Sequence, residues 1–447
     1  MIVMKFGGTS VGSAKSIRDV CAIVRGRHER HPLVVTSAHG KDAGHGKITD
    51  MLIAAAHAAL EGNPDSGVIE ARQLGLIRDL GLDASLVRPL LDNLAELLKG
   101  ISMVEELTPR TLDYVQSFGE RMAARVVAAQ MQQEGMDAIA VDSFDLGLRT
   151  DARYGAANPA PDCYAEMKKR WAEIEAEIVV TTGFVAKCPD GHITTLGRGG
   201  SDYSATIFGA ALGAEEVEIW TDVNGVMTAD PGIVPASRSL PELTFNEASE
   251  LAWYGAQVLH PSTILPAVDA GVPVRVLNTM APEQSGTVIL PDSTEKANVA
   301  KSVVYKEDLT LIDITSSRML MSHGFMAKVF HIFEKHEIVI NMIATSEVTI
   351  SLTSDAPAAR LEPAVAELET YGAVNCKPAH AIICLIGEGM GGIIGTAGRM
   401  CRALAEAKVN IQMISQGARE INIAVCVDNN DIEPAVRALH AEFFETA

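Results

Sequence analysis

The sequence predicts an α/β fold, with a mostly parallel sheet sandwiched by helices over residues 1–290 and two smaller repeated units after it. Three observations predict this fold. Short β-rich runs alternate with helical stretches up to residue 290, and strands joined through helices need the crossover connections of a parallel sheet. This alternation ends at the Pro- and Gly-containing segment 281–286. Beyond it, one stretch of sequence occurs twice without gaps.

The first part of the chain begins with a strand, a glycine turn and a helix. Residues 2–6 form the expected strand, and from Ile17 onward apolar residues recur at i, i+3, i+4 and i+7, as on a helix with one buried face. Residues 62–109 are helical in pattern and are expected to form an excursion over the sheet. The Pro-Asp-Gly sequence at 189–191 predicts a hairpin turn. Further strands are expected at 33–37, 138–141, 178–184, 217–221 and 274–277.

Composition narrows the possible partners and the compartment. Acidic residues outnumber basic ones 57 to 37, for a formal net charge of −20, and such a surface repels nucleic acid and anionic membranes, so neither is expected as a partner. The seven cysteines include no Cys-x-x-Cys pair, and no Cys/His cluster has the spacing of a zinc site. Reduced thiols in the cytoplasm are therefore expected. The first eight residues show neither a signal-peptide core nor a transit leader, which favours the same compartment.

The repeat aligns residues 324–343 with residues 395–414, so that Lys328 matches Arg399 and Phe333 matches Leu404. Strands are expected before each copy, at 310–314 and 382–386, and after each copy, at 348–353 and 421–427. A strand, a glycine loop that opens a helix and two more strands make up half or more of a ferredoxin-like βαββαβ unit. Two such units side by side suit the binding of a small molecule between them, although a duplicated unit can also be purely structural.

Two glycine turns are candidate anion sites. Lys5 precedes Gly7 and Gly8, where the backbone could approach a phosphate closely at the start of a helix, although a tight turn without a ligand is the alternative. The second turn places Arg198 between glycines, where a bidentate hold on a carboxylate or phosphate is the natural use of arginine. Ser201 or Asp202 would cap the helix that follows this turn.

Two further segments carry candidate polar groups. Thr221 and Asp222 end a predicted parallel strand, and open α/β sheets bind ligands at the carboxyl ends of their strands. Glu120 follows a glycine at the expected start of a helix. A first-turn glutamate that favours the helix dipole explains Glu120 as well as a functional role does.

Together these motifs resemble one family. KFGGTSVG at 5–12, SFGER at 117–121, TLGRGGSDYSA at 195–205, TDVNGVMTADP at 221–231 and GAQVLHP at 255–261 resemble aspartate kinase over essentially the whole chain. The resemblance implies the amino-acid kinase fold over 1–290, followed by two ferredoxin-like ACT units at 300–380 and 381–447 that are interleaved. No fused dehydrogenase is expected.

The resemblance implies that the γ-phosphoryl of ATP, with Mg²⁺, is transferred to the side-chain carboxylate of L-aspartate. That carboxylate is already ionised at neutral pH, so the nucleophile needs no general base. Lys5 and Asp202 would be catalytic, with Lys5 neutralising the transferring phosphoryl and Asp202 orienting Lys5 or the phosphate–Mg²⁺ cluster. Aspartate would be bound by Ser37, Thr49, Glu120, Arg198 and Ser201, and ATP by Lys5, Gly7, Gly8, Ser10, Thr221, Asp222, Met227 and Gln257.

Three positions depart from the commonest bacterial pattern. Met227 replaces a tyrosine of the nucleotide loop, Gly232 replaces an arginine, and Gln257 replaces a lysine as in the plant-type branch. They suggest altered contacts to the nucleotide rather than an inactive enzyme. Another amino-acid kinase, acting on glutamate, acetylglutamate or a nucleotide, and a catalytically silent amino-acid-binding regulator are the alternatives.

The ACT units imply feedback inhibition, in the pathway that leads to lysine, threonine and methionine. Lysine is the favoured inhibitor by resemblance to lysine-sensitive members, although these carry aspartate where this chain has Asn341, which keeps threonine open. A homodimer or homotetramer built through the ACT units is expected, because such pairing covers sheet edges. The expected inhibitor site is formed by Met319, Ser322, Gly324, Phe325, Met326, Ile340, Asn341, Thr345 and Ser346.

Overall fold

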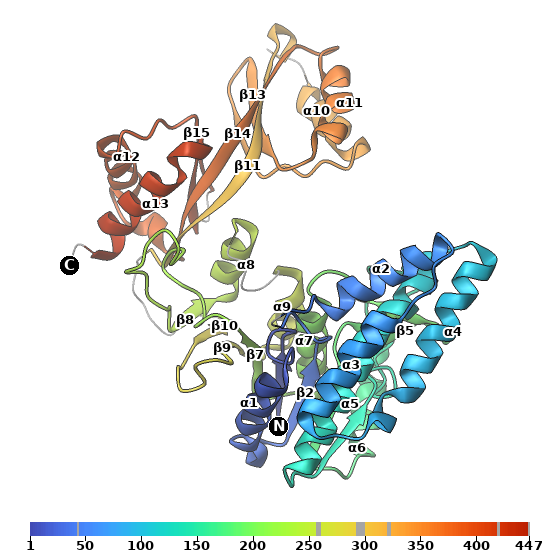
Figure 1. Cartoon of the computed structure of the whole chain (residues 1–447). Coiled ribbons are helices and arrows are strands. Elements are labelled where there is room, and N and C mark those ends of the chain that lie inside the picture. Colours follow the sequence, from blue (N-terminus) through green and yellow to red (C-terminus); the bar gives the residue numbers. More distant parts are fainter. Residues whose placement is uncertain (43, 256–260, 292–299, 320–322, 418–420, 446–447) are drawn as a thin grey trace. The chain divides into compact units, whose positions relative to one another are not determined.

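The structure, a computed structural model, describes the chain except for residues 43, 256–260, 292–299, 320–322, 418–420 and 446–447 (Figure 1). The chain divides into two compact units. The first consists of residues 1–226, 241–245 and 258–293, and the second of residues 227–240, 246–257 and 294–447.

The first unit is built on a mostly parallel sheet, as predicted. β1 (Ile2–Phe6) lies inside it and pairs in parallel with β2 (Pro32–Thr36) on one side and β7 (Val217–Thr221) on the other. Among the pairings described in this sheet, that of β10 with β9 alone is antiparallel. The strand order is β3 (Ala138–Val141), β4 (Ile178–Thr182), β2, β1, β7, β9 (Val274–Asn278), β10 (Thr287–Leu290) and β8 (Glu242–Thr244).

The central strands are buried on both faces. Every residue of β1, β2 and β4 is buried, as expected for parallel strands that carry helices on both sides. β4 ends two residues earlier than predicted because Gly183 packs against Ser201 and Phe184 adopts a left-handed φ of 63°. The predicted turn at 189–191 is confirmed, since it joins β5 (Val185–Lys187) to β6 (Ile193–Thr195) in an antiparallel hairpin.

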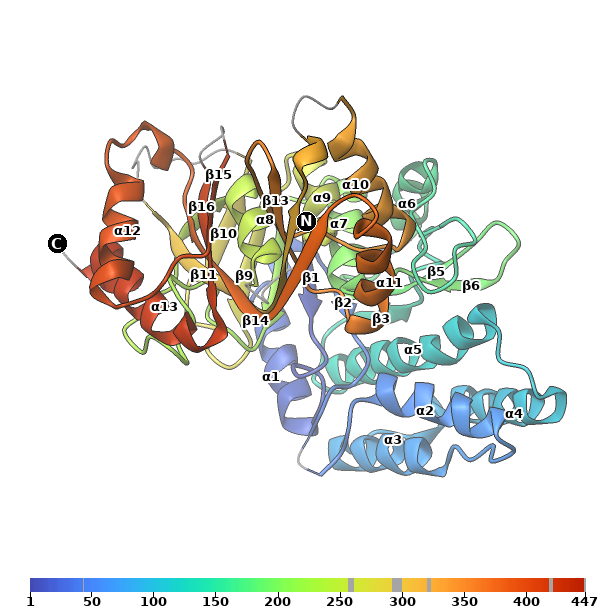
Figure 2. The same ribbon diagram turned by 90° about the horizontal axis from the view of Figure 1, so that it is seen from above.

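The helices of this unit follow the apolar pattern of the sequence. α1 (Ala14–Arg25) is opened by a capping box between Ser13 and Ser16 and buries Ile17, Val20 and Val24. The predicted helical excursion is confirmed: α2 (Ile48–Leu60), α3 (Gly67–Leu80), α4 (Arg88–Val104) and α5 (Pro109–Gln133) lie alongside one another in both ribbon views (Figure 2). Three further helices belong to this unit: α6 (Cys163–Ala172), α7 (Gly200–Leu212) and α9 (Pro261–Ala270).

The second unit is built on an antiparallel sheet whose two middle strands are long. β11 (Ser302–Thr315) and β14 (Ala373–Ile386) pair with each other from end to end. The order of the described strands is β12 (Met342–Thr345), β13 (Thr349–Ser354), β11, β14, β16 (Asn422–Asp428) and β15 (Met413–Gln416). Its helices are α8 (Phe245–Trp253), α10 (Phe325–Lys335), α11 (Ala358–Leu368), α12 (Thr396–Glu406) and α13 (Ile432–His440).

Each long strand serves two ferredoxin-like units. The order β12-β13-β11-β14 is that of one unit and β15-β16-β14-β11 that of the other, so each unit takes its fourth strand from the other copy of the repeat. The register between β11 and β14 shifts after Lys306, and Asp308 and Ala379 there adopt positive φ values of 58° and 60°. The predicted fold class is thus confirmed, with the two units joined in one sheet.

The repeat is visible in equivalent detail in both copies. α10 and α12 each begin after a glycine in the left-handed region, Gly324 at φ 78° and Gly395 at φ 96°. The aligned residues Phe333 and Leu404 are both fully buried in separate cores. The helix-to-strand alignment read from the sequence therefore corresponds to the same three-dimensional unit twice.

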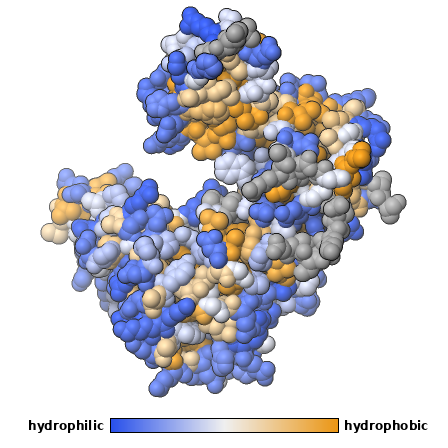
Figure 3. Space-filling view, turned by 180° about the vertical axis from the view of Figure 1, so that it is seen from behind, coloured by the Kyte–Doolittle hydropathy of each residue, from blue (hydrophilic) through white to orange (hydrophobic). Residues whose placement is uncertain are grey.

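The surface mixes apolar and polar side chains. The face drawn in Figure 3 shows hydrophobic residues interspersed with hydrophilic ones. In the described part of the chain, none of the helices is both long enough and apolar enough to cross a bilayer.

Candidate active site

The first strand and the seventh helix meet in an ion pair. Lys5, on β1, places its Nζ 2.6 Å from Oδ1 of Asp202, in the first turn of α7. Both side chains are largely buried, at 10% and 17% exposure. Gly199, with a left-handed φ of 70°, precedes α7 without a side-chain cap, so the prediction that Ser201 or Asp202 caps this helix is wrong. A positive φ at the capping position favours glycine, and Asp202 is left to hold the Lys5 ammonium.

The glycine loop after β1 offers few free amides. The N–H of Gly7 donates to the carbonyl of Trp220 at 3.2 Å, so it is engaged within the fold. Among the described residues, the N–H groups of Gly8 and Thr9 have no hydrogen-bond acceptor. Ser10, predicted as a nucleotide ligand, is 1% exposed, and its hydroxyl lies 2.7 Å from that of Thr279. An anion at this loop would therefore meet Gly8 and Thr9 rather than Gly7.

A second loop, at 37–42, packs against the glycine loop. The N–H of Gly40 donates to the carbonyl of Gly8 at 2.8 Å, and a Cβ on Gly40 would collide with the Gly8 backbone. Arg72, a 7%-exposed residue of α3, donates from Nη2 to the carbonyl of Gly40. His39 is buried beside them, with Nδ1 2.6 Å from the carbonyl of Val11, and burial lowers its pKa to about 4. The neutral imidazole of His39 thus joins the two loops, and the buried guanidinium of Arg72 fixes the second loop to α3.

Glu120 lies in the interior of the fold. It is in the middle of α5, which begins at Pro109, so the alternative of a first-turn glutamate at a helix start is wrong. Its Oε1 accepts the N–H of Ala38 at 3.1 Å, next to Ser37, while Oε2 is buried and accepts no hydrogen bond from the described residues. Burial raises the pKa of Glu120 to about 8. A buried carboxylate with one free oxygen suits an ammonium group.

The remaining predicted aspartate ligands surround the same end of the sheet. Arg198 is exposed between Gly197 and Gly199, and no carboxylate of the described chain lies within 4 Å of it. Ser201 packs against Gly183 after β4, and Ser37 follows β2, where its N–H donates to the carbonyl of Phe6. Thr49 is half-buried in the first turn of α2.

Asp113 of α5 stabilises the segment that leads into the turn at 197–199, which carries Arg198, and was not among the predicted site residues. Its carboxylate accepts three bonds of 2.9 Å, from the N–H of Gly155 and from the N–H and hydroxyl of Thr195. Thr195 ends β6, two residues before Gly197. A lone aspartate within a helical pattern carries no sequence signal for this role, and neither does Arg72.

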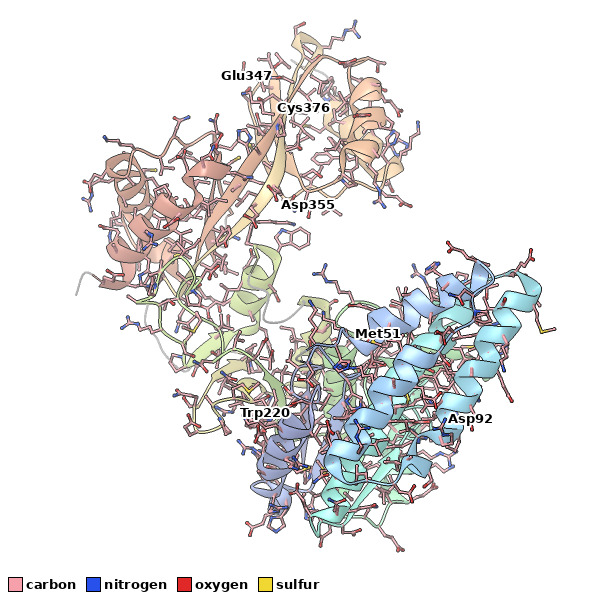
Figure 4. All side chains as sticks on the ribbon, in the orientation of Figure 1. Met51, Asp92, Trp220, Glu347, Asp355 and Cys376 are labelled. Carbon is pink, nitrogen blue, oxygen red and sulfur yellow. The ribbon has the colours of Figure 1, made fainter. Side chains whose placement is uncertain are left out.

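The predicted nucleotide residues fall into two groups. Thr221 ends β7, directly after Trp220, which is labelled in Figure 4. The Trp220 ring stacks on that of Phe6 of β1, with 5.8 Å between the ring centroids. The Thr221 hydroxyl donates to the exposed Asp222 at 3.1 Å. Met227 belongs to the second unit, where its carbonyl accepts the Ser302 hydroxyl at 2.8 Å. Gln257 lies outside the described residues.

Comparisons with known proteins show the family to which the chain belongs. Residues 1–278 match the amino acid kinase family, and residues 383–443 match the ACT domain. The chain belongs to the amino acid kinase family. It is 40% identical to the chloroplastic aspartokinase 2 of Arabidopsis thaliana, over 99% of this chain and 84% of that protein. It is 31% identical to the lysine-sensitive aspartokinase 3 of Escherichia coli, over 100% and 99%.

Solved structures show the same fold over the full chain of this amino acid kinase. The aspartokinase III of Escherichia coli in complex with aspartate and ADP, in the R-state, matches with a TM-score of 0.80 at 32% identity, covering 99% of this chain and 100% of that one. The aspartate kinase of Clostridium acetobutylicum matches with a TM-score of 0.85 at 27% identity, with the same coverage. The predicted resemblance to aspartate kinase is therefore confirmed.

The inhibitor segments predicted for this amino acid kinase lie in its second unit. Asn341 is 7% exposed; its N–H donates to the carbonyl of Thr353, and its side-chain Oδ1 and Nδ2 are buried without a partner among the described residues. The Ser346 hydroxyl accepts the N–H of Thr349 at 3.1 Å, which is turn chemistry between β12 and β13. Ser322 lies outside the described residues. The other predicted positions are Met319, Gly324, Phe325 and Met326 around the start of α10, Ile340 between α10 and β12, and Thr345 on β12.

Proposed function

We propose that this protein transfers the γ-phosphoryl group of ATP to the side-chain carboxylate of L-aspartate, giving 4-phospho-L-aspartate. The observation that carries the proposal is the Lys5–Asp202 ion pair of 2.6 Å beside a glycine loop with free amides. Bringing an anionic carboxylate to a polyanionic nucleotide requires positive charge and positioning more than covalent chemistry. The aspartokinase names of the relatives support the same substrate.

Each group would have a distinct role. Lys5 would neutralise charge on the transferring phosphoryl, held in place by Asp202, while the N–H groups of Gly8 and Thr9 would bind phosphate oxygens. Arg198 would bind the α-carboxylate of aspartate, since its guanidinium has no carboxylate partner among the described residues. Glu120 would bind the substrate ammonium through its free Oε2. Ser37, Thr49 and Ser201 would complete that site, and Thr221 and Asp222 would meet the nucleotide.

Mg²⁺ would accompany ATP rather than reside in the protein. The described residues contain no group of three or more His, Cys, Asp or Glu side chains that could hold a metal ion. Mg²⁺ often binds through substrate phosphates, water and one or two carboxylates, and Asp202 and Asp222 offer that number. When bound, the ion would supply further neutralisation of the phosphate charge.

We further propose which parts of the chain catalyse the reaction and which regulate it. Residues 1–290 would form the catalytic domain, and residues 300–380 and 381–447 the two ACT units. The regulator would be an end product of the lysine, threonine and methionine pathway bound beside Asn341. Lysine is favoured, because a relative is lysine-sensitive and a related structure contains lysine. Threonine is the alternative, since Asn341 offers a neutral amide and no counter-charge.

A homodimer or homotetramer formed through the ACT units is also proposed. β12 and β15 are the edges of the six-stranded sheet and pair on one side only in the described structure. The two edge strands also lie near each other within the chain. Sheet edges without a hydrogen-bonded neighbour are commonly paired with another chain. The protein is expected to work in the cytoplasm, because its seven cysteines are free thiols. Light scattering should give a particle larger than the 47.6 kDa chain, and a monomer at working concentration would contradict the proposal.

The activity is tested by trapping the acyl phosphate with hydroxylamine. Hydroxamate should form with ATP, Mg²⁺ and aspartate and be absent with glutamate. Hydroxamate with glutamate or acetylglutamate, or ADP formation with a nucleotide as the acceptor, would favour another amino-acid kinase. No ADP formation with any acceptor would favour a silent regulator. Titration with lysine, threonine and methionine, on the natural chain and on Ser346→Ala, tests the regulation: inhibition by none of the three would remove the site at Asn341.

A further inference from the structure

A pocket in the first unit lies on the face of α5 that does not carry the Glu120 carboxylate. It encloses about 710 Å³, which is within the range of small-molecule sites. Its walls come from α4, α5, the loop after β3 and the β5–β6 hairpin. None of the residues predicted to bind aspartate or ATP lines it. The pocket is therefore separate from the candidate active site.

The walls of this pocket are cationic in a chain that is strongly acidic. Four full positive charges line it, from Arg110, Arg121, Arg125 and Lys187, against two negative charges from Asp142 and the exposed Asp145. The formal balance of these side chains is positive, while the whole chain carries −20. A local reversal of charge in a concave site attracts anions.

One carboxylate serves two guanidinium groups at the base of the pocket. Asp142 is 4% exposed; its Oδ1 accepts Nη1 of Arg125 at 2.8 Å, and its Oδ2 accepts Nε of Arg121 at 3.2 Å. The Nη1 atom of Arg121 is buried and has no hydrogen-bond partner among the described residues. A buried guanidinium N–H without an acceptor is costly unless a ligand supplies one.

Two more cations lie at the rim of the pocket. No carboxylate oxygen of the described chain lies within 4 Å of Arg110 or Lys187. The Lys187 ammonium lies over the ring of Phe144 at 3.7 Å, and Arg110 Nη1 lies 3.5 Å from Nε2 of His192. Aromatic and imidazole neighbours place these cations without neutralising them.

We propose that this pocket binds a small multivalent oxyanion, carrying either a phosphate group or two carboxylates, through Arg110, Arg121 and Lys187. The buried Nη1 of Arg121 would donate to one anionic group at the base. Arg110 and Lys187 would bind from the rim. The proposal concerns binding alone and does not depend on the reaction proposed above.

The test is isothermal titration with inorganic phosphate and, separately, malonate, at constant ionic strength. The natural chain should bind at least one of them saturably, and the stronger of the two identifies the anionic group. The double variant Arg110→Gln/Lys187→Gln should weaken that binding about tenfold or more, since each change removes a charge-assisted contact. Lys168→Gln, at an exposed cation of α6 outside the pocket, should leave it unchanged.

Phosphate could also bind at the glycine loop, so Lys5→Met is titrated in parallel. Affinity that survives Lys5→Met and falls in the pocket variant supports the proposal. Affinity lost in Lys5→Met but kept in the pocket variant overturns it, as does the absence of saturable binding of either anion to the natural chain. Arg110→Gln alone, at an exposed side chain, provides the same comparison where the double variant fails to fold.

Discussion

Lys5 Nζ and Asp202 Oδ1 lie 2.6 Å apart, joining the first strand of the sheet to the first turn of α7. Both side chains are mostly shielded from water, so the ammonium is held in one position beside Gly7, whose own N–H is already engaged with Trp220. A fixed positive charge needs little reorganisation when a phosphoryl group is transferred past it. The pair also ties the glycine loop to the arginine turn that precedes α7.

Lys5→Ala should reduce kcat about a hundredfold or more, with a smaller change in the KM for aspartate. The physical reason is that the lost charge acts on the transferring phosphoryl rather than on bound aspartate. Steady-state kinetics with varied aspartate at saturating ATP would measure it. A variant that changes the KM for aspartate and leaves kcat intact would contradict this role.

Arg198→Ala should raise the KM for aspartate about tenfold or more and leave kcat comparatively unaffected. An exposed guanidinium between two glycines, with no carboxylate partner among the described residues, is available for the substrate. Arg170→Ala is the matched control, since Arg170 pairs with Glu166 and Glu173 on the protein surface. Equal effects of both changes would remove Arg198 from the aspartate site.

Glu120 predicts a pH dependence of stability. Its pKa rises from 4.5 in the unfolded chain to about 8 in the folded protein, because it is buried. Between these two pH values the folded state keeps a proton that the unfolded state loses. The contribution of Glu120 to the free energy of unfolding is therefore fully present below about pH 4.5 and falls by about 1.4 kcal/mol per pH unit up to about pH 8. Glu120→Gln should flatten this decline in urea unfolding between pH 5 and 8. Parallel curves for both chains would contradict the assignment.

The same group predicts that aspartate binding releases a proton. A substrate ammonium near Oε2 favours the ionised carboxylate, so the KM for aspartate should fall as the pH rises from 6.5 to 8.5. Calorimetric titration in two buffers of different ionisation enthalpy would count the protons. Release that persists in Glu120→Gln would show that another group is responsible.

Arg72→Met should lower the free energy of unfolding by roughly 2–4 kcal/mol and raise the KM for ATP. The change removes the buried donor to the Gly40 carbonyl, and Gly40 packs on Gly8 of the glycine loop. Arg78→Met, at an exposed side chain of the same helix, should do neither. If Arg72→Met lost stability but kept its KM for ATP, the arginine would be structural and would not position the loop.

Asn341→Asp should make inhibition by lysine about tenfold stronger and leave inhibition by threonine unchanged. Both polar side-chain atoms of Asn341 are buried and have no hydrogen-bond partner in the described part of the chain, and a carboxylate there would pair with the lysine ammonium. Dose–response curves for the two amino acids would measure this, with Asn375→Asp, at an exposed position of β14, as the control. Inhibition by lysine that weakens in Asn341→Asp would place the ammonium elsewhere.

The apolar pattern of the sequence predicts the central strands of the first sheet but not β8 and β10 at its edge. Residues 2–6 and 217–221 are five-residue strands rich in apolar side chains, whereas β8 and β10 are short strands of three and four residues. They gain their stability from pairing with β9 and with each other, a tertiary effect that propensity does not show. The repeat predicted two units, but not that β11 and β14 extend through both.

In the candidate site, the sequence predicts the residues of the motifs but not the side chains that hold those motifs in place. Lys5, Glu120 and Arg198 stand in recognisable sequences, and the structure places Lys5 against Asp202 as one of the expected arrangements. Arg72 and Asp113 act by hydrogen bonds to backbone groups of distant loops, at Gly40 and Thr195. Such contacts depend on how elements pack, which a spacing rule between neighbouring residues does not contain.

The long strands β11 and β14 make the two copies of the repeat inseparable. A chain cut after residue 380 would end inside β14, so the first unit would keep only part of its fourth strand. A chain that began there would lack β11, which is the fourth strand of the second unit. The two copies of the repeat are therefore expected to be kept or lost together in evolution, because either copy alone would leave a sheet edge without its neighbouring strand. Selection acts on the two halves as one object.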